Sequence, residues 1–331
     1  MRPVAVLPLV WSLSLMAACV GPIPTRGSPS VSTDAKPSGS GAKAQRAVVL
    51  GGGGLTGYAW EVGILKGLRD AGIDLTVADL IIGTSAGSIL GTQIRSGKAV
   101  DDLYASMLAP PSGGSPPARS PADVQYLQDT YRLWLTGAEN TATMRVEVGK
   151  RALETPHPIA EEAQKNRWRR MLGISEWPNQ PLKISAVDIT DGAVRFFDRS
   201  QDVGIETAAA ASTAIPGLHA PITVGDRRYM DGGVATTGID AALGYGTVVA
   251  ITTGGGQLVR QQVELVRSGG SRIVNVSPDA ESLSALGTDR MVASQAKPSA
   301  EAGLRQAGMV VEEVRKVWTG ATSTAPSATT K

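Results

Sequence analysis

The chain has 331 residues, and its 32 basic and 30 acidic side chains give a formal net charge of +2 at pH 7. This near balance, without long runs of like charge, gives no electrostatic reason to expect a nucleic-acid partner. Hydrophobic residues make up 42% of the chain and glycine contributes 39 residues, which fits a globular α/β protein with a sizeable core. The single cysteine, Cys19, excludes an internal disulfide, and two histidines add too few ligands for a zinc site.

The N-terminus has the pattern of an export signal. Arg2 precedes an uncharged apolar run within residues 1–18 that has the length of a signal core and is short for a membrane span. Ala17 and Ala18 stand directly before Cys19, which resembles a bacterial lipoprotein signal whose cysteine becomes the lipid-modified first residue. The departure is Met16, where leucine is usual. The alternative is an ordinary secretory signal in which Cys19 has no role.

Composition divides the rest of the chain into three parts. Residues 19–45 are rich in Pro, Gly, Ser, Thr and Ala and are expected to form a flexible tether. Residues 46–318 carry the periodic apolar patterns of a folded domain. Residues 319–331 are of low complexity and are expected to be disordered. Together these patterns predict a catalytic or binding domain held at a membrane, with a lipid anchor at Cys19 and an exported, envelope-bound location.

The domain opens with a strand–helix–strand pattern. Short apolar runs at 47–50 and 80–82 predict two strands, and the spacing of apolar residues between them predicts a helix over 58–71. A unit of this length is typical of a right-handed crossover that joins two parallel strands. If the strands are neighbours, the residues that follow each of them lie at the same sheet edge, where open α/β sheets bind ligands.

Further elements complete an α/β fold. Residues 86–95 predict a helix that ends near Gly97, and residues 98–180 predict a mostly helical insertion that carries Trp134, Trp168 and Trp177. The insertion is a candidate lid or apolar pocket, although any one tryptophan is more simply a core residue. Asp202 is the expected cap of an alanine-rich helix. Two hairpins are expected, with strands at 182–189 and 193–198 and at 222–224 and 228–230. Single apolar runs predict further strands at 247–252 and 272–276, which complete a sheet of at least six strands. An amphipathic final helix is expected over 304–318.

Ser85 is the first candidate for chemistry. It lies in Gly83-Thr84-Ser85-Ala86-Gly87, a G-x-S-x-G sequence placed between a predicted strand and a predicted helix. Glycines on both sides relieve crowding in the sharp turn that exposes a serine nucleophile. The simpler alternative is a helix N-cap.

The four glycines at 51–54 allow two interpretations. Gly52, Gly54 and Gly57 match the G-x-G-x-x-G fingerprint of dinucleotide binding, with Asp74 near the expected distance. A run of glycines also suits an oxyanion hole, because the backbone can approach an anion without side chains in the way. In a dinucleotide site the acid should end the second strand, whereas Asp74 precedes it. The oxyanion hole is therefore the preferred interpretation.

A serine nucleophile needs a base. His157 and His219 lie in proline-containing loops and are expected to be structural, and an acid for a triad would have to come from strand ends such as Asp188 or Asp198. Asp231 is the better candidate, because it ends a predicted strand and Gly232-Gly233 free the backbone to turn it toward a site. The alternative is that Asp231 only caps a tight turn.

These motifs together resemble the patatin-like phospholipases, lipid acyl hydrolases of three-layer α/β/α fold. The resemblance rests on 51–68, 83–88 and 211–233 and covers the domain from about residue 46 to 276. It implies a Ser85–Asp231 dyad, supported by the motif glycines Gly83, Gly87, Gly232 and Gly233. It also implies an oxyanion hole, and the backbone groups that would form it belong to Gly52, Gly53, Gly54 and Ala86. One departure is Thr56, where many members have Arg or Lys.

The sequence therefore predicts a serine lipid acyl hydrolase that works through an acyl-enzyme on a phospholipid or simpler lipid ester. No metal or organic cofactor is expected. Two alternatives remain: a lipid-binding envelope lipoprotein that keeps the fold without turnover, and a nucleotide-binding domain.

Overall fold

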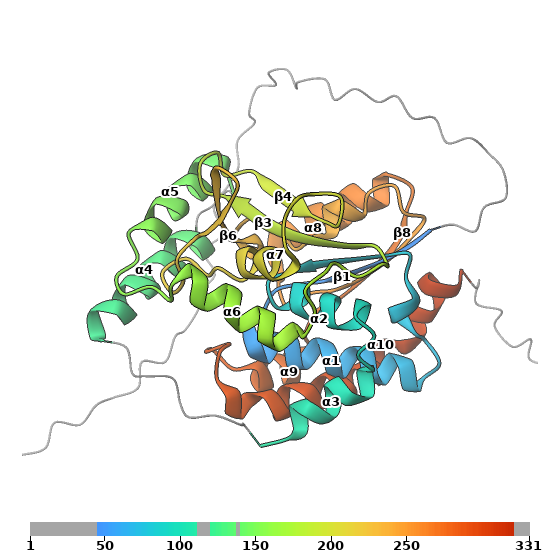
Figure 1. Ribbon diagram of the computed structural model, residues 1–331. Helices are drawn as coiled ribbons and strands as arrows, with labels where there is room; N and C mark the ends of the chain where they lie inside the picture. Colours follow the sequence, from blue (N-terminus) through green and yellow to red (C-terminus); the bar gives the residue numbers. More distant parts are fainter. Residues whose placement is uncertain (1–44, 111–119, 137–139, 321–331) are drawn as a thin grey trace, which may run out of the picture. The chain divides into compact units, whose positions relative to one another are not determined.

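The computed structural model describes residues 45–110, 120–136 and 140–320, and these residues contain one central eight-stranded sheet (Figure 1). The neighbours β3-β2-β1-β7-β8 all run parallel, whereas β4 and β6 pair antiparallel with β3, and β5 pairs antiparallel with β6. The strands are β1 (Arg46–Leu50), β2 (Leu80–Thr84), β3 (Leu182–Asp188), β4 (Val194–Phe197), β5 (Ile222–Val224), β6 (Arg227–Asp231), β7 (Thr247–Ile251) and β8 (Arg272–Val276).

Helices cover both faces of the sheet. Alternate residues of the parallel strands belong to two separate apolar clusters, as expected for a sheet that is buried on both faces. The larger cluster lies under α1, α2, α3 and α10 and the smaller one under α8, which Figure 1 shows on the opposite side. The helices are α1 (Gly54–Asp70), α2 (Ala86–Arg95), α3 (Val100–Leu108), α4 (Pro121–Thr136), α5 (Ala142–Leu153), α6 (Glu161–Leu172), α7 (Ile205–Ser212), α8 (Gly256–Ser268), α9 (Ala280–Leu286) and α10 (Ala296–Thr319), with short 3-10 turns η1 (Leu75–Val77), η2 (Gly232–Val234), η3 (Ile239–Ala242) and η4 (Ala293–Gln295).

Strands β2 and β6 share one edge of β3. Ser185 pairs with Thr84 of β2, and the next residue, Ala186, pairs with Asp231 of β6, while both also pair with β4. A strand residue has two edges, so β2 and β6 occupy the same edge in succession. Because β6 runs antiparallel to β3 and β2 runs parallel to it, the carboxyl ends of β2 and β6 meet.

Helix α1 crosses α10 at very short range. A methyl group added to Gly63 would lie 2.1 Å from the carbonyl oxygen of Ala300, and one added to Gly303 would lie 2.2 Å from that of Trp60. The two glycines let the helix backbones touch, which brings the remaining side chains of both helices into close packing. This contact fixes α1, and with it the glycine loop from which α1 begins.

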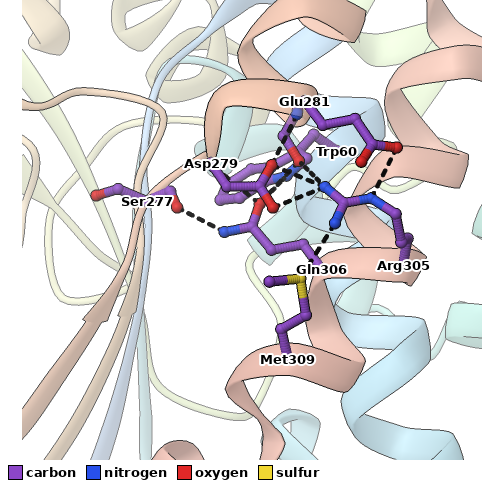
Figure 2. Close-up of polar contacts among 8 residues, drawn as sticks. Trp60, Ser277, Asp279, Glu281, Arg305, Gln306 and Met309 are labelled. Atoms are coloured by element: carbon purple, nitrogen blue, oxygen red, sulfur yellow. Dashed lines mark hydrogen bonds and ion pairs between the residues drawn. The ribbon is translucent and has the colours of Figure 1, made fainter.

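A polar network ties α1 and α10 to the end of β8 (Figure 2). Gln306 of α10 accepts hydrogen bonds from the indole N–H of Trp60 and the backbone N–H of Asp279, and donates to the carbonyl of Ser277 at 2.7 Å. Arg305 forms an ion pair with Asp279 at 2.7 Å. The polar groups of α1, α10 and the segment after β8 thus satisfy one another's hydrogen bonds, which fixes how these three elements are placed relative to each other.

The structure confirms the expected three-layer fold with a mostly parallel sheet and a helical insertion. Two expectations about helix starts are wrong. Helix α1 begins at Gly54 instead of near residue 58, and α7 has Gly204 at its N-cap in place of Asp202. The predicted signal 1–18, most of the tether and residues 321–331 lie outside the described residues. Within the described part, none of the helices is long and apolar enough to cross a bilayer.

The α1–α10 crossing makes a stability prediction. Gly63→Ala and Gly303→Ala should each lower the free energy of unfolding by about 1–3 kcal/mol, because a methyl group would overlap backbone atoms. Gly308→Ala is the matched control: it lies in α10 with nothing within 4 Å of an added methyl, and should stabilise by about 0.5–1 kcal/mol. Chemical denaturation measures all three, and unchanged stability in the first two would contradict the close crossing.

Candidate active site

Ser85 lies in a strained turn between β2 and α2. Its backbone angles are φ 51° and ψ −117°, a conformation that is costly for a residue with a side chain. The flanking glycines explain how the turn fits: a methyl on Gly83 would lie 2.5 Å from Ser88 Cα, and one on Gly87 would lie 2.1 Å from the carbonyl oxygen of Leu50. The elbow is therefore packed directly on the end of β1.

Ser85 occupies the N-cap position of α2 but its side chain does not cap the helix. Its hydroxyl donates a hydrogen bond to Asp231 Oδ2 at 2.7 Å. Its backbone N–H is donated to Ser212 Oγ at 2.9 Å, a contact that helps to hold the strained conformation. The geometry thus disagrees with the simple N-cap interpretation.

Asp231 ends β6 and uses its two carboxylate oxygens differently. Oδ1 accepts the N–H of Gly233 at 2.8 Å, which is the turn cap considered from sequence, and Oδ2 accepts the hydroxyl of Ser85. The side chain is only 2% exposed. Burial raises the pKa of Asp231 to about 7, against the opposing effect of the hydrogen bonds from Ser85 and Gly233. Gly232 is needed for close approach, since a methyl there would lie 2.2 Å from Ser185 Oγ.

The glycine loop lies beside the serine. A methyl on Gly52 would lie 3.3 Å from Ser85 Cβ. Gly53 and Gly54 have φ of +149° and +64°, which favour glycine, and Gly53 is the N-cap of α1. Among the described residues, none accepts a hydrogen bond from the N–H groups of Gly52, Gly53, Gly54 or Ala86. The loop therefore offers unpaired donors at the start of α1, where the helix dipole also favours an anion.

Two segments that sequence reasoning missed hold this loop. Thr253, which follows β7, donates its hydroxyl to the carbonyl of Gly52. On the other side, a methyl on Gly54 would lie 2.7 Å from the carbonyl oxygen of Arg290, which also accepts the N–H of Thr56 at 3.1 Å. The backbone of the α9–η4 segment thus covers the Thr56 position. No local motif marks this segment in the sequence.

A further carboxyl lies behind the loop. Glu61 of α1 is fully buried, and no hydrogen bond of normal geometry reaches its carboxyl oxygens in the described part of the chain. Burial raises the pKa of Glu61 well above its ordinary value, against the opposing effect of the nearby backbone N–H of Gly51. The uncharged form of this carboxyl is thereby favoured.

The other sequence candidates lie in local structural contacts. His219 is buried and its Nδ1 accepts the N–H of Ile215, whereas the side chain of His157 is 85% exposed beside Asp123. Asp74 accepts the backbone N–H of Thr76 and so caps a local turn, which is not the role of the ribose-binding acid in a dinucleotide site. Asp188 pairs with Arg227, and Asp198 caps its own turn. Within the described residues, no group of three or more His, Cys, Asp or Glu is placed to hold a metal ion.

A sequence profile of the family described as "Patatin-like phospholipase" matches residues 48–243, more than half of the chain. The chain belongs to this family. The matched range includes both the G-x-S-x-G turn and the strand that ends at Asp231. A search of the curated proteins gives no match.

Solved structures related to this patatin-like phospholipase are distant. VipD from Legionella pneumophila has 12% identity and a TM-score of 0.41, covering 82% of this chain and 67% of that chain. Human GIVD cytosolic phospholipase A2 has 11% identity and a TM-score of 0.44, covering 84% and 61%. The type III effector ExoU of Pseudomonas aeruginosa has 17% identity and a TM-score of 0.31, covering 80% and 53%. The chain spans about half to two thirds of these proteins, and the family assignment comes from the sequence match.

The raised pKa of Asp231 predicts a pH-dependent stability. The unfolded group has a pKa near 3.8 and the folded group about 7, so the folded state binds more protons between these values and loses stability as the pH rises through them. Asp231→Asn removes this penalty and should raise Tm by a few degrees at pH 8 and by less at pH 5. Calorimetry at both pH values measures this difference, and an equal shift at pH 5 and pH 8 would contradict the raised pKa.

Proposed function

We propose that this patatin-like phospholipase hydrolyses lipid esters through a Ser85–Asp231 dyad and an acyl-enzyme. The observation that carries the proposal is the hydrogen bond of 2.7 Å from Ser85 Oγ to Asp231 Oδ2. It joins a serine held in a strained turn to a carboxylate that has a pKa of about 7. A base whose pKa lies near the working pH is suited to take and return a proton.

The proposed first step forms an acyl-enzyme. Ser85 Oγ attacks the ester carbonyl carbon while its proton passes to Asp231 Oδ2. The carbonyl oxygen becomes an oxyanion, which the N–H groups of Gly53, Gly54 and Ala86 would stabilise, each such donor being worth typically about 3 kcal/mol. When the carbon–oxygen bond of the ester breaks, Asp231 returns the proton to the departing alcohol.

The second step releases the acid. Water attacks the acyl carbon on Ser85 while its proton passes to Asp231, and the same backbone donors hold the second oxyanion. The bond from the acyl carbon to Ser85 Oγ then breaks, and Asp231 returns the proton to Ser85 Oγ. The raised pKa of Glu61 favours its uncharged form, whereas a charged carboxylate near the loop would oppose both oxyanions. The substrate class is an ester with an apolar acyl chain, either a phospholipid or a simpler lipid ester.

The dyad is tested by hydrolysis of p-nitrophenyl acyl esters. Ser85→Ala and Asp231→Asn should each lower kcat/KM by at least about a thousandfold, because the nucleophile or its base is lost. In the wild type, kcat/KM should rise with pH and reach half its maximum near pH 7, where Asp231 loses its proton. Circular dichroism controls for folding of both variants, and full activity in either one would exclude the dyad.

We also propose that the enzyme is exported and anchored through a lipid on Cys19, with residues 19–45 as the tether. The support is the apolar segment that ends in Ala17-Ala18-Cys19. In a bacterial host, the wild type should incorporate labelled palmitate and fractionate with membranes, and Cys19→Ser should do neither. Equal incorporation by the variant would contradict anchoring at Cys19.

A further inference from the structure

Helix α4 of the insertion packs against the segment that carries Asp231. Leu127 of α4 lies against Gly217, where an added methyl would be 3.1 Å from Leu127 Cδ1. Just beyond α4, Asn140 donates hydrogen bonds to the carbonyls of Val234 and Ala235. Figure 1 shows α4 and α5 near β6. The insertion is thus part of the wall beside the base rather than a remote addition.

Trp134 is the α4 side chain nearest to this base among those that the contacts show. A methyl built on Gly233 would lie 3.6 Å from Trp134 Cζ2 and 3.1 Å from Asp231 Oδ1. The indole and the carboxylate therefore both lie beside Gly233, close to each other. Trp134 is half-buried: it packs against the apolar cluster that contains Met230 and Val234, and its ring lies 5.5 Å from that of Tyr131.

In the described part of the chain, the carboxylate of Asp231 accepts hydrogen bonds from two donors, Ser85 Oγ–H and Gly233 N–H. No charged side chain contributes to the shift of its pKa, whose largest cause is the loss of water. The charged groups on neighbouring elements are engaged elsewhere, in the pairs Asp188–Arg227 on β3 and β6, Asp129–Arg132 on α4 and Asp123–His157 between α4 and the loop that precedes α6. Tyr131 is the other titratable group on the same turn of α4. Exclusion of water is thus the main property that the wall gives to the base.

We propose that Trp134 is a positioning residue of the active site, which closes the Asp231 side to water and presents an apolar surface to the substrate's acyl chain. The inference rests on the proposed Ser85–Asp231 chemistry and adds a role for the helical insertion. The indole acts through the carboxylate and takes no part in proton transfer. Its packed part keeps water from the base, and its remaining apolar surface, close to Gly233, offers contact to an acyl chain.

The first test uses Trp134→Leu and Trp134→Phe on p-nitrophenyl esters of increasing chain length. Trp134→Leu should admit water and move the midpoint of the pH profile of kcat/KM downward from about 7 by about one pH unit. It should also reduce the preference for long over short chains by about tenfold, since contact with a few methylenes is lost. Trp134→Phe should restore most of both properties.

Trp177→Leu is the matched control. Trp177 also lies in the insertion, where its indole N–H is donated to the carbonyl of Val203, and it packs against a different apolar cluster from Trp134. This variant should keep the wild-type midpoint and chain-length preference. If Trp134→Leu is folded and keeps both as well, the proposal is overturned.

The second test needs no catalysis. The gain in Tm from Asp231→Asn at pH 8 should be smaller in the Trp134→Leu background than in the wild type, because a hydrated carboxylate costs less to ionise. An equal gain in both backgrounds would overturn the shielding role. A wild type that hydrolyses no ester would contradict the proposed function, while this thermal cycle would still decide whether Trp134 keeps water from Asp231.

Discussion

The hydrogen bond between Ser85 and Asp231 depends on the way in which β2 and β6 share one edge of β3. Strand β3 pairs first with β2 and then, along the same edge, with β6, which runs in the opposite direction. The serine follows the last residue of β2 and the aspartate is the last residue of β6. Ser185 pairs with Thr84 of β2, and its neighbour Ala186 pairs with Asp231 of β6. These pairings bring Ser85 Oγ and Asp231 Oδ2, from residues 146 positions apart, to 2.7 Å. Because β2 and β6 hold both partners, the proposed dyad is built on the ends of rigid strands.

The end of the sheet concentrates features that cost stability. Ser85 is held in a strained conformation, and Asp231 and Glu61 are carboxyl groups buried without a cation. Such costs persist only where the surrounding structure over-determines them. Here the close crossing of α1 and α10 and the Gln306 network fix α1, while Ser212 and Thr253 hold the elbow and the loop. The rest of the fold therefore stabilises a site that would not hold this geometry by itself.

Much of the fold and the key residues of the candidate site can be predicted from the sequence. The strands, the β2 turn at Ser85 and the carboxyl position at the end of β6 follow from local apolar patterns and glycine spacing. The meeting of β2 and β6 does not, because it depends on long-range pairing with β3. Trp134 belongs to the insertion that the sequence offers as a candidate lid or apolar pocket, but its place beside Asp231 depends on tertiary packing. The contact of Arg290 with the glycine loop also depends on tertiary packing, from a segment without a motif. The predicted start of α1 is four residues too late, because glycine has a low helix propensity and the sequence alone does not indicate a helix that begins at Gly54.

The claim that Ser85 is an activated nucleophile is tested most directly by a fluorophosphonate probe, with the adduct located by mass spectrometry. The account predicts one adduct per folded chain, on Ser85, formed at a rate that falls to half near pH 7 as Asp231 gains a proton. The Asp231→Asn variant, which keeps the turn but lacks the base, should label far more slowly. Folded wild-type protein that takes up no probe at pH 8, or that carries the adduct on another residue, would contradict the account.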